Sequence, residues 1–419
     1  MVDLRNFPCR VLIVGAGPTG TTAALALKKY TPHIQVTLID KASFPRDKAC
    51  GDGLGPGACR MLERLGLIEL LDGFNRPTSV ALIGPDGTEA SSRGLLIGEK
   101  DLAGSVAPRL ELDNRLVEEC IREGVTVRTE ERFKELEELA NGQIRVISEG
   151  LSPLEKRVGT YEFVVAADGA YSAVRRFIKS PTAKKSKTYV AMRSYASIAH
   201  PSASIAETLR LDFIGEFLPA YGWCFPVSDD CANIGVGLPI SQLRNGDQTL
   251  RQLLDHYYDD LRRRGFEVGS PERVRSHKLP HAAARLRMAC GHVLFLGDAA
   301  ATINSFSGEG IFYGMAAGVQ LAEQLSLVAP GPDVNWAREL RLFEDAFKRR
   351  FRRHFISSYV VHLIFKSRGW TNTIIHSAAV NRAVMATGAS IMFDEGTITP
   401  RLIFRALRHG VRYASWGKF

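Results

Sequence analysis

The fold class of this chain is decided by the stretch Arg10-Val11-Leu12-Ile13-Val14-Gly15-Ala16-Gly17-Pro18-Thr19-Gly20. The compact apolar run predicts a buried strand, and three glycines at this spacing predict a tight turn that opens a helix. The alanine- and leucine-rich residues 21–29 continue that helix, and Val36-Thr37-Leu38-Ile39 supplies a second strand that ends at Asp40. Together these elements predict a βαβ unit of the kind that binds dinucleotides.

Each glycine of the turn has a separate expected role. A dinucleotide carries two negative phosphates, which backbone N–H groups at a helix N-terminus bind. Gly15 permits the turn, Gly17 lets the backbone approach the phosphates, and Gly20 lets helix and strand pack closely. Asp40 follows after about 20 residues, where an acid accepts hydrogen bonds from ribose hydroxyls. A plain glycine-rich turn is the alternative, but strand, loop, helix, strand and acid occur here in the required order.

Two later segments also end a buried strand in an acidic turn. Residues 164–167 lead to Asp168-Gly169, with Ser172 and Arg175 beyond, and residues 294–296 lead to Gly297-Asp298. The Asp298 carboxylate would meet the ribityl hydroxyls of a flavin. Downstream, Gly308-Glu309-Gly310-Ile311 opens a helix whose N–H groups would stabilise negative charge on a reduced flavin ring. The three segments together predict one FAD site and redox chemistry.

The pattern of strands and helices changes along the chain. Residues 186–275 contain short β runs broken by Gly, Pro, Asn and Asp, which is typical of an antiparallel sheet. Amphipathic helices are expected at 60–72 and 111–122, and nearly everything after Gly308 has a helical pattern. We therefore expect an α/β fold: a Rossmann-like FAD-binding domain of the glutathione-reductase type, an inserted antiparallel β-sheet substrate domain, and a helical C-terminal region. The expected bounds are 1–76, 102–185 and 276–330 for the FAD-binding domain, 77–101 and 186–275 for the substrate-binding domain, and 331–419 for the C-terminal region.

Composition limits the class of protein. The 419 residues are 45% hydrophobic and 24% charged, which is a globular balance with a sizeable core. Seven cysteines without CxxC pairs or zinc-type spacing indicate no disulfide framework, no metal site and a reducing compartment. The charged start, residues 1–10, is unlike a signal peptide, and no apolar run of about 18 residues would span a membrane. We expect a cytoplasmic protein.

The net charge of +9 indicates an anionic partner. Basic residues concentrate in residues 348–353 and again from Arg401 to Lys418, where five cations meet no acid and apolar residues are interleaved. That mixture is typical of a helix that lies on an anionic bilayer, at the periphery of the inner membrane face. A docked C-terminal helix with a solvated basic face is the alternative. No nucleic-acid module accompanies the charge, so nucleic acid is not expected, and the oligomeric state stays open.

Three motifs carry a resemblance to a known family. They are the loop Phe44-Pro45-Arg46-Asp47-Lys48-Ala49-Cys50-Gly51-Asp52-Gly53-Leu54, the run Tyr221-Gly222-Trp223-Cys224-Phe225-Pro226 with Asn233-Ile234-Gly235-Val236-Gly237 after it, and Arg109 with Asp113 and Leu116. They resemble the geranylgeranyl reductase family, whose superfamily includes para-hydroxybenzoate-hydroxylase-type monooxygenases and tryptophan halogenases. The Cys50 loop and Thr397-Ile398-Thr399-Pro400-Arg401 are most similar to actinobacterial menaquinone-side-chain and isoprenoid reductases.

The resemblance implies reduction of isolated C=C bonds in an isoprenoid chain, by hydride transfer from reduced FAD. NADPH or a ferredoxin-type donor would be the external reductant. The sequence contains no second GxGxxG motif, so a separate NADPH domain is not expected. Cys50 and Gly51 are the candidate catalytic residues, with Cys50 as proton donor. A small buried apolar side chain is the alternative role for this cysteine.

The resemblance also extends the set of candidate binding residues. Tyr221, Trp223 and Phe225 are two apart on one strand, so they share a face and would line an apolar tunnel, although ordinary sheet core is the alternative. The candidate substrate-binding residues are Tyr221, Trp223, Phe225, Pro226 and Phe306. The candidate cofactor-binding residues are Gly15, Gly17, Thr19, Gly20, Asp40, Lys41, Arg46, Cys50, Gly51, Arg109, Asp168, Gly297, Asp298, Gly308, Gly310 and Ile311.

The chain departs from the family pattern at two positions expected to border the cavity. Ser305 stands where proline is usual, and Val227 stands where lysine is frequent. The halogenase signature Trp-x-Trp-x-Ile-Pro is absent, because Tyr221 and Phe225 occupy its first and fifth positions. Two other functions stay open: an FAD- and NAD(P)H-dependent monooxygenase or epoxidase of an apolar, for example terpenoid, substrate, which needs only a dry cavity beside the flavin, and a non-catalytic flavin-bound scaffold or lipid carrier.

Overall fold

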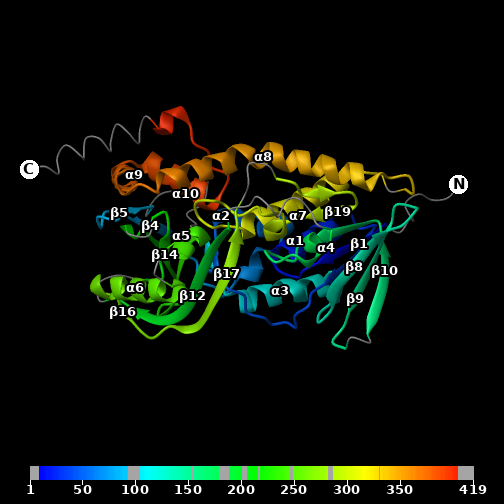
Figure 1. The fold of residues 1–419 in the computed structure, drawn as a ribbon, viewed down its shortest axis with the longest axis horizontal. Coiled ribbons are helices and arrows are strands. Elements are labelled where there is room, and N and C mark those ends of the chain that lie inside the picture. Colours follow the sequence, from blue (N-terminus) through cyan, green and yellow to red (C-terminus); the bar gives the residue numbers. More distant parts are fainter. Residues whose placement is uncertain are drawn as a thin grey trace, which may run out of the picture.

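The computed structural model describes residues 9–92, 104–152, 155–178, 188–200, 205–215, 218–245, 249–281, 286–329 and 331–403 of the 419. The elongated molecule carries one large sheet toward each end, and the long helix α8, Trp336–Ile364, runs along the top of both (Figure 1). The part of the protein that the structure describes contains no helix long and apolar enough to cross a membrane.

The first sheet is built around the opening strand of the chain. Its order is β18-β19-β11-β1-β2-β7, and every pairing except that of the edge strand β18 is parallel. The central strand β1 is apolar on both faces, as parallel strands covered by helices usually are. The bounds are β1 Cys9–Val14, β2 Ile34–Ile39, β7 Thr126–Arg128, β11 Phe163–Ala166, β18 Ala289–Cys290 and β19 Val293–Phe295. The carboxyl ends of β1, β2, β11 and β19 therefore meet at one edge, and the expected βαβ unit is confirmed.

Helices and small sheets surround this first sheet. The helix α1, Pro18–Tyr30, follows the glycine turn and packs against α7, Ile311–Leu325. The helix α3 spans Arg109–Arg122 and α4 spans Ala173–Phe177. A three-stranded antiparallel sheet contains β8 Arg132–Glu138, β9 Ile144–Glu149 and β10 Lys156–Tyr161, and a two-stranded one pairs β3 Gly53–Leu54 with β6 Ser105–Val106.

The second large sheet has the order β16-β12-β15-β14-β13-β4-β5, with β17 paired to β12. It is mixed rather than purely antiparallel, because β4 joins β13 in parallel register. Its strand β17 also runs past residue 275, where we expected the substrate domain to end. The bounds are β4 Ser79–Ile83, β5 Glu89–Ser91, β12 Thr188–Ala199, β13 Thr208–Asp212, β14 Tyr221–Pro226, β15 Cys231–Pro239, β16 Glu267–Val268 and β17 Glu272–Pro280. The helices near this sheet are α5, Ile240–Asn245, and α6, Leu250–Arg263, and α6 packs its apolar side on β12 and β15.

The C-terminal helices join the two halves. Along α8, Phe343, Phe347, Phe351 and Phe355 pack into the core of the first sheet. Beyond its end, Phe365 packs into the core of the second sheet, together with α9, Arg368–Val380, and α10, Arg382–Phe393. One helix therefore contributes to both cores. Residues 404–419, which include most of the predicted basic C-terminal helix, lie outside the described residues.

One predicted helix is interrupted. The residues expected as a single helix at 60–72 form α2, Pro56–Leu65, and a short 3-10 helix, η2, Ile68–Leu71. Gly66 ends α2 because its φ of 78° is left-handed, a conformation that favours glycine and stops a helix. The helical pattern alone did not indicate this break between α2 and η2.

Candidate functional site

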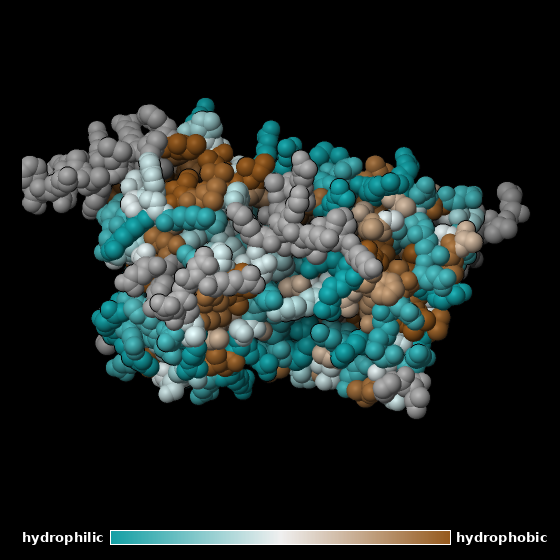
Figure 2. Space-filling model, in the orientation of Figure 1, coloured by the Kyte–Doolittle hydropathy of each residue, from teal (hydrophilic) through white to brown (hydrophobic). Residues whose placement is uncertain are grey.

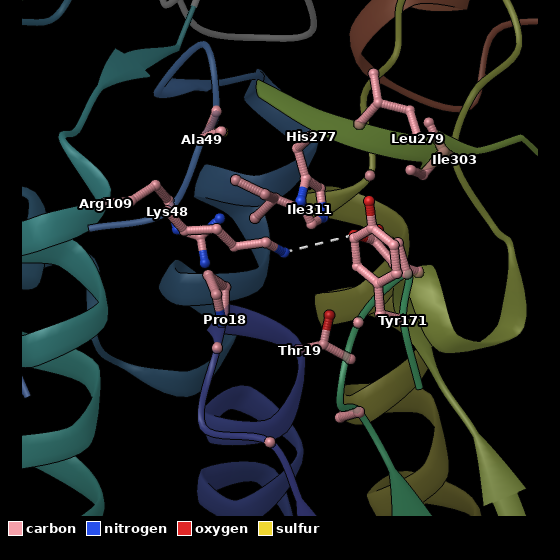
Figure 3. A pocket seen from close by; sticks show the side chains of 18 of the residues that line it. Pro18, Thr19, Lys48, Ala49, Arg109, Tyr171, His277, Leu279, Ile303 and Ile311 are labelled. Carbon is pink, nitrogen blue, oxygen red and sulfur yellow. Dashed lines mark ion pairs between the residues drawn. The ribbon is translucent and has the colours of Figure 1, made fainter. Parts of the chain in front are cut away.

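A cavity of about 570 Å³ lies where the carboxyl edge of the first sheet meets the second sheet. Its lining includes residues from all three glycine and acid segments, from the Cys50 loop and from β14. The predicted residues that line it are Gly15, Gly17, Thr19, Asp40, Lys41, Arg46, Cys50, Gly51, Arg109, Asp168, Asp298, Gly308, Gly310, Ile311, Tyr221, Trp223 and Phe225. Segments that are far apart in the sequence therefore line the same cavity, part of which is shown in Figure 3.

Two predicted glycines do not line the cavity. A Cβ added at Gly20 would lie 1.9 Å from the carbonyl oxygen of Gly15, and one added at Gly297 would lie 2.6 Å from the Thr19 hydroxyl. Both glycines therefore allow close packing behind the cavity wall. The close packing expected at Gly20 is thus present, whereas neither glycine is among the residues that line the cavity.

Four other positions also lie outside the cavity lining. Phe306 packs against Phe213 and Phe365, with ring centroids 5.9 and 4.7 Å away, so it belongs to the apolar core under α8. Pro226 is buried at the end of β14, where its carbonyl accepts a hydrogen bond from Asn75. The two departures from the family pattern, Ser305 and Val227, do not border the cavity either. Ser305 is buried, and Val227 packs against the same apolar core.

The glycine turn is set against two guanidinium groups. Gly15 has a φ of 105°, and a Cβ there would lie 2.5 Å from the carbonyl oxygen of Ala167, so only glycine fits. A Cβ added at Gly17 would lie 3.5 Å from an Arg46 nitrogen and 3.6 Å from an Arg109 nitrogen. The free N–H groups at the start of α1 and two cations therefore surround one point, which is the environment that phosphates require.

A buried carboxylate holds these two arginines in place. Asp113 accepts two hydrogen bonds from Arg109, at 2.6 and 2.7 Å, in a bidentate pair on α3. The same carboxylate lies 3.2 Å from a nitrogen of Arg46. Asp113 and its hydrogen bonds raise the pKa of Arg109 despite the opposing effect of burial. Arg46 also lies 3.8 Å from Asp40, so the two guanidinium groups are held between two carboxylates beside the glycine turn.

Asp40 already has backbone partners at the end of β2. One oxygen accepts the N–H of Ala16 at 2.8 Å, and the other accepts the N–H of Ala42 at 2.9 Å. A carboxylate has about four acceptor sites, so capacity remains for ribose hydroxyls. Asp40 therefore fixes the turn as well as offering the predicted contact.

The second acidic turn is tied to the third by an arginine. The Asp168 carboxylate accepts the N–H groups of Ala173 and Val174, while its other oxygen is buried with no partner among the described residues. Burial raises the pKa of Asp168. Arg175 donates to the carbonyl of Ala299 at 2.7 Å, which connects the turn after β11 with the turn after β19. The unsatisfied oxygen of Asp168 leaves an acceptor for a bound ligand.

Lys48, His277 and Tyr171 all line the cavity (Figure 3). Lys48 forms an ion pair of 3.5 Å with Asp298, and Tyr171 packs edge-on against His277 at 5.5 Å. Burial and the nearby Lys48 lower the pKa of His277 to about 4. His277 is therefore neutral at physiological pH, and its buried Nε2 atom has no partner among the described residues.

The Cys50 loop lies against the aromatic face of β14. A Cβ added at Gly51 would lie 3.2 Å from the Trp223 indole nitrogen and 3.3 Å from the Phe225 ring. Trp223 in turn covers Gly235, where a Cβ would lie 2.2 Å from the indole. Burial raises the pKa of the Cys50 thiol, so the sulfur keeps its proton. The site thus combines a protonated thiol with two flat apolar walls.

Asn233 connects this loop to the sheet. Its amide nitrogen donates to the carbonyl of Cys50 at 2.8 Å and to the carboxylate of Asp52 at 2.7 Å, and its amide oxygen accepts the Trp223 indole N–H at 3.0 Å. Tyr195 donates to the same Asp52 oxygen at 2.5 Å. One buried amide therefore fixes the distance between the Cys50 backbone and the Trp223 ring.

Glu309 adds a buried acid beside the start of α7. It lines the cavity, and its carboxylate accepts the N–H of Phe312 at 2.8 Å. Burial raises its pKa to about 7. Near neutral pH much of this group is uncharged, which reduces its repulsion of an anionic ligand.

Sequence reasoning did not assign several of these residues. Lys48, Asp52, Asn233 and Glu309 lie within the motifs quoted above, so their position in those motifs was an available signal. Arg193, Tyr195 and His277 lie on β12 and β17, and no local pattern marks them. Among the described residues, no group of three or more His, Cys, Asp or Glu side chains would hold a metal ion.

Comparison with known proteins gives one family. Residues 8–337 match the FAD binding domain family. A menaquinone reductase of Mycolicibacterium smegmatis is 34% identical over 339 residues, which is 77% of each chain. A menaquinone reductase of Mycobacterium tuberculosis is 37% identical over 322 residues, covering 75% of this chain and 76% of the relative. A digeranylgeranylglycerophospholipid reductase of Methanopyrus kandleri is 27% identical over 357 residues, covering 82% and 83%.

Solved structures share the fold. A geranylgeranyl bacteriochlorophyll reductase-like protein of Thermoplasma acidophilum has a TM-score of 0.77 at 19% identity, covering 98% of this chain and 99% of that one. The flavin-dependent halogenase CmlS has a TM-score of 0.69 at 19% identity, covering 99% and 71%. The expected fold class is confirmed. Because reductase and halogenase share it, the fold alone does not separate the two chemistries.

The residues present fit FAD. The glycine turn and the guanidinium pair suit a pyrophosphate, and the buried Asp168 oxygen lacks a partner that a bound nucleotide would supply. Thr19 and Asp298 line the same cavity and would hold other parts of the cofactor.

Replacing Gly15 with alanine tests the cofactor site. The added methyl collides with the Ala167 carbonyl, so Gly15→Ala should purify with at least tenfold less bound flavin, measured by flavin absorbance per protein. Gly87→Ala is the matched control, because Gly87 also has a positive φ, of 88°, but no atom lies within 4 Å of its added Cβ. Equal flavin content in the two variants would contradict the assignment.

The pKa of Glu309 predicts a dependence of stability on pH. The folded pKa of about 7 lies above the unfolded value of about 4.5, so the contribution of Glu309 to stability is fully present below pH 4.5 and is lost as pH rises through 7. Glu309→Gln does not titrate, so its free energy of unfolding relative to wild type should rise by about 3 kcal/mol across this range. Urea unfolding at several pH values measures the difference. The exposed control Glu267→Gln should show no such slope, and a flat profile for Glu309→Gln would refute the assignment.

Proposed function

We propose that this chain, which belongs to the FAD binding domain family, is an FAD-dependent oxidoreductase that reduces isolated carbon–carbon double bonds in an isoprenoid chain. Its curated relatives are named as reductases of menaquinone and of digeranylgeranylglycerophospholipid, both of which carry prenyl chains. An apolar prenyl or lipid substrate is the class that these names and the aromatic cavity wall have in common.

The observation that carries this proposal is the contact between the Cys50 loop and the aromatic face of β14, inside the cavity that the glycine turn also lines. When bound and reduced, FAD supplies a hydride to one carbon of the double bond. The other carbon needs a proton, and an isolated alkene has no carbonyl to polarise. A proton donor close to the apolar wall is therefore the group that the protein has to provide.

Cys50 is the residue that we propose for this role. Its raised pKa keeps the thiol protonated, and its backbone is held by Asn233. Proton transfer to the carbon leaves a thiolate, which solvent re-protonates after the product leaves. Trp223 and Phe225 hold the flat alkene segment by apolar contact and exclude water, and Tyr221, whose hydroxyl donates to the carbonyl of Ser307, completes that side.

We infer that the electrons come from an external reductant that docks transiently. The sequence has one glycine turn of the dinucleotide type, and the described residues line one cavity with it. NADPH and a ferredoxin-type protein are the two donors compatible with this arrangement. Anaerobic reduction of the flavin by each donor distinguishes them.

Product mass separates reduction from oxygenation. Incubation of the pre-reduced holoenzyme with menaquinone or a geranylgeranyl lipid, without oxygen, should give a product with two added hydrogen atoms per bond reduced. A product with one added oxygen atom, formed only when oxygen is present, would instead identify a monooxygenase. If the substrate is recovered unchanged under both conditions, the result would favour the scaffold or carrier alternative.

The role of Cys50 is tested by substitution with serine. Cys50→Ser replaces the thiol by a much weaker acid of similar size, so turnover should fall by about 10²-fold or more while flavin content stays constant. The exposed Cys290→Ser is the matched control and should keep wild-type turnover. Wild-type turnover in Cys50→Ser, measured as alkene reduced per flavin, would show that the cysteine is only a small buried side chain.

A further inference from the structure

We propose that the outer face of α8 docks on an anionic lipid bilayer. This α8 outer face consists of Arg349, Arg352, Arg353, Ile356, Val360 and Leu363. The inference rests on the proposed function, because a prenyl lipid dissolves in a bilayer, and it names the surface through which the enzyme would reach it.

Helix geometry places these side chains on one side. Residues three and four apart lie above one another on a helix, so Ile356, Val360 and Leu363 form a row. They are 46%, 38% and 40% exposed, whereas Phe355 and Ser358 on the other side of the same turns are buried. The second half of α8 therefore carries apolar side chains on its solvent-exposed side as well as on its core-facing side, unlike an ordinary surface helix.

Two further exposed apolar side chains lie on segments that follow α8. Trp370 at the start of α9 is 50% exposed, and Ile403 is 49% exposed. The segment that leads to Ile403 begins beside α8, because the N–H of Ile398 donates to the Ser357 hydroxyl at 3.0 Å. Figure 2 shows hydrophobic surface gathered over the end of the molecule where α8, α9 and α10 lie.

The charge around this surface suits phosphate headgroups. No Asp or Glu occurs between residues 346 and 393, a stretch that contains eight Lys and Arg. Within the described residues, Lys348 and Arg350 pair with Glu344 and Glu395, whereas Arg349, Arg352 and Arg353 have no ion pair.

An apolar row that continues from unpaired arginines on one helix face matches the headgroup and acyl layers of an anionic bilayer. A nucleic acid would use the cations but would not require the apolar row. The surface therefore favours a lipid partner over a polyanion in solution.

Vesicle sedimentation tests the surface with the full-length holoenzyme. Binding is measured to phosphatidylcholine vesicles with and without an equal part of phosphatidylglycerol. The variant Ile356→Asp/Val360→Asp should bind the anionic vesicles at least tenfold more weakly than wild type. Arg352→Gln/Arg353→Gln should weaken binding to anionic vesicles about 25-fold and binding to neutral ones little, since each cation near such a surface contributes about fivefold.

Leu342→Asp is the matched control. Leu342 is 42% exposed on the same helix but lies before the arginines, next to Glu344 and Asp345. Its vesicle binding should equal that of wild type. Thermal melting and flavin content show that each variant is folded.

Three outcomes would overturn the proposal. They are wild-type vesicle binding by both double variants, loss of binding only when Arg405, Arg408 and Arg412 are changed to Gln, and a dimer in solution that the Ile356→Asp/Val360→Asp variant dissociates. The proposed function is measured separately, by reduction of a detergent-solubilised substrate. Loss of vesicle binding with retained activity in detergent supports both proposals, whereas retained vesicle binding without any reduction refutes the function alone.

Discussion

The close approach of the Gly15 backbone to the carbonyl of Ala167 is the constraint on which this site depends. It is possible only because β1 and β11 are parallel neighbours and residue 15 carries no side chain. That contact sets the glycine turn beside the turn of Asp168, and Arg175 then connects the latter to the turn after β19. Three segments that are separated by well over a hundred residues therefore form one wall, held by the backbone contact at Gly15 and by the Arg175 side chain.

Charged and uncharged groups line the same cavity. Arg46 and Arg109 contact Asp113 beside the glycine turn, Lys48 pairs with Asp298, and the neutral His277 and the high-pKa Glu309 and Cys50 also line the cavity. Burial produces each of those perturbed pKa values, because removal from water disfavours the charged form. The cavity therefore combines guanidinium groups, which suit the phosphates of a cofactor, with groups that burial keeps uncharged, which suit a substrate without charge.

The sequence predicted the first sheet well and the second less well. Residues 10–20 and Asp40 form a local motif in which each side chain has a role that depends on its own backbone, so spacing alone was informative. The parallel pairing of β4 with β13 depends on residues more than a hundred positions apart, and alternation of apolar residues carries no information about strand direction. The same limit explains the site: Gly20, Gly297, Pro226 and Phe306 lie in the correct motifs, but only packing shows that they face the core.

Positions without a local motif were not predictable. Tyr195 and Arg193 contact the Cys50 loop because β12 is next to β15, and that adjacency arises from the whole sheet order. Asn233 was visible only as part of a resemblance, although its three hydrogen bonds connect the loop to Trp223.

The position of α8 also limits how the molecule can move. Its four phenylalanines are in the core of the first sheet, and its continuation at Phe365 is in the core of the second. Separation of the two sheets as rigid bodies would expose several of these rings, at about 2 kcal/mol or more for each. Packing of α8 and its continuation therefore disfavours such an opening and helps to fix the spacing between the cofactor wall and the aromatic wall.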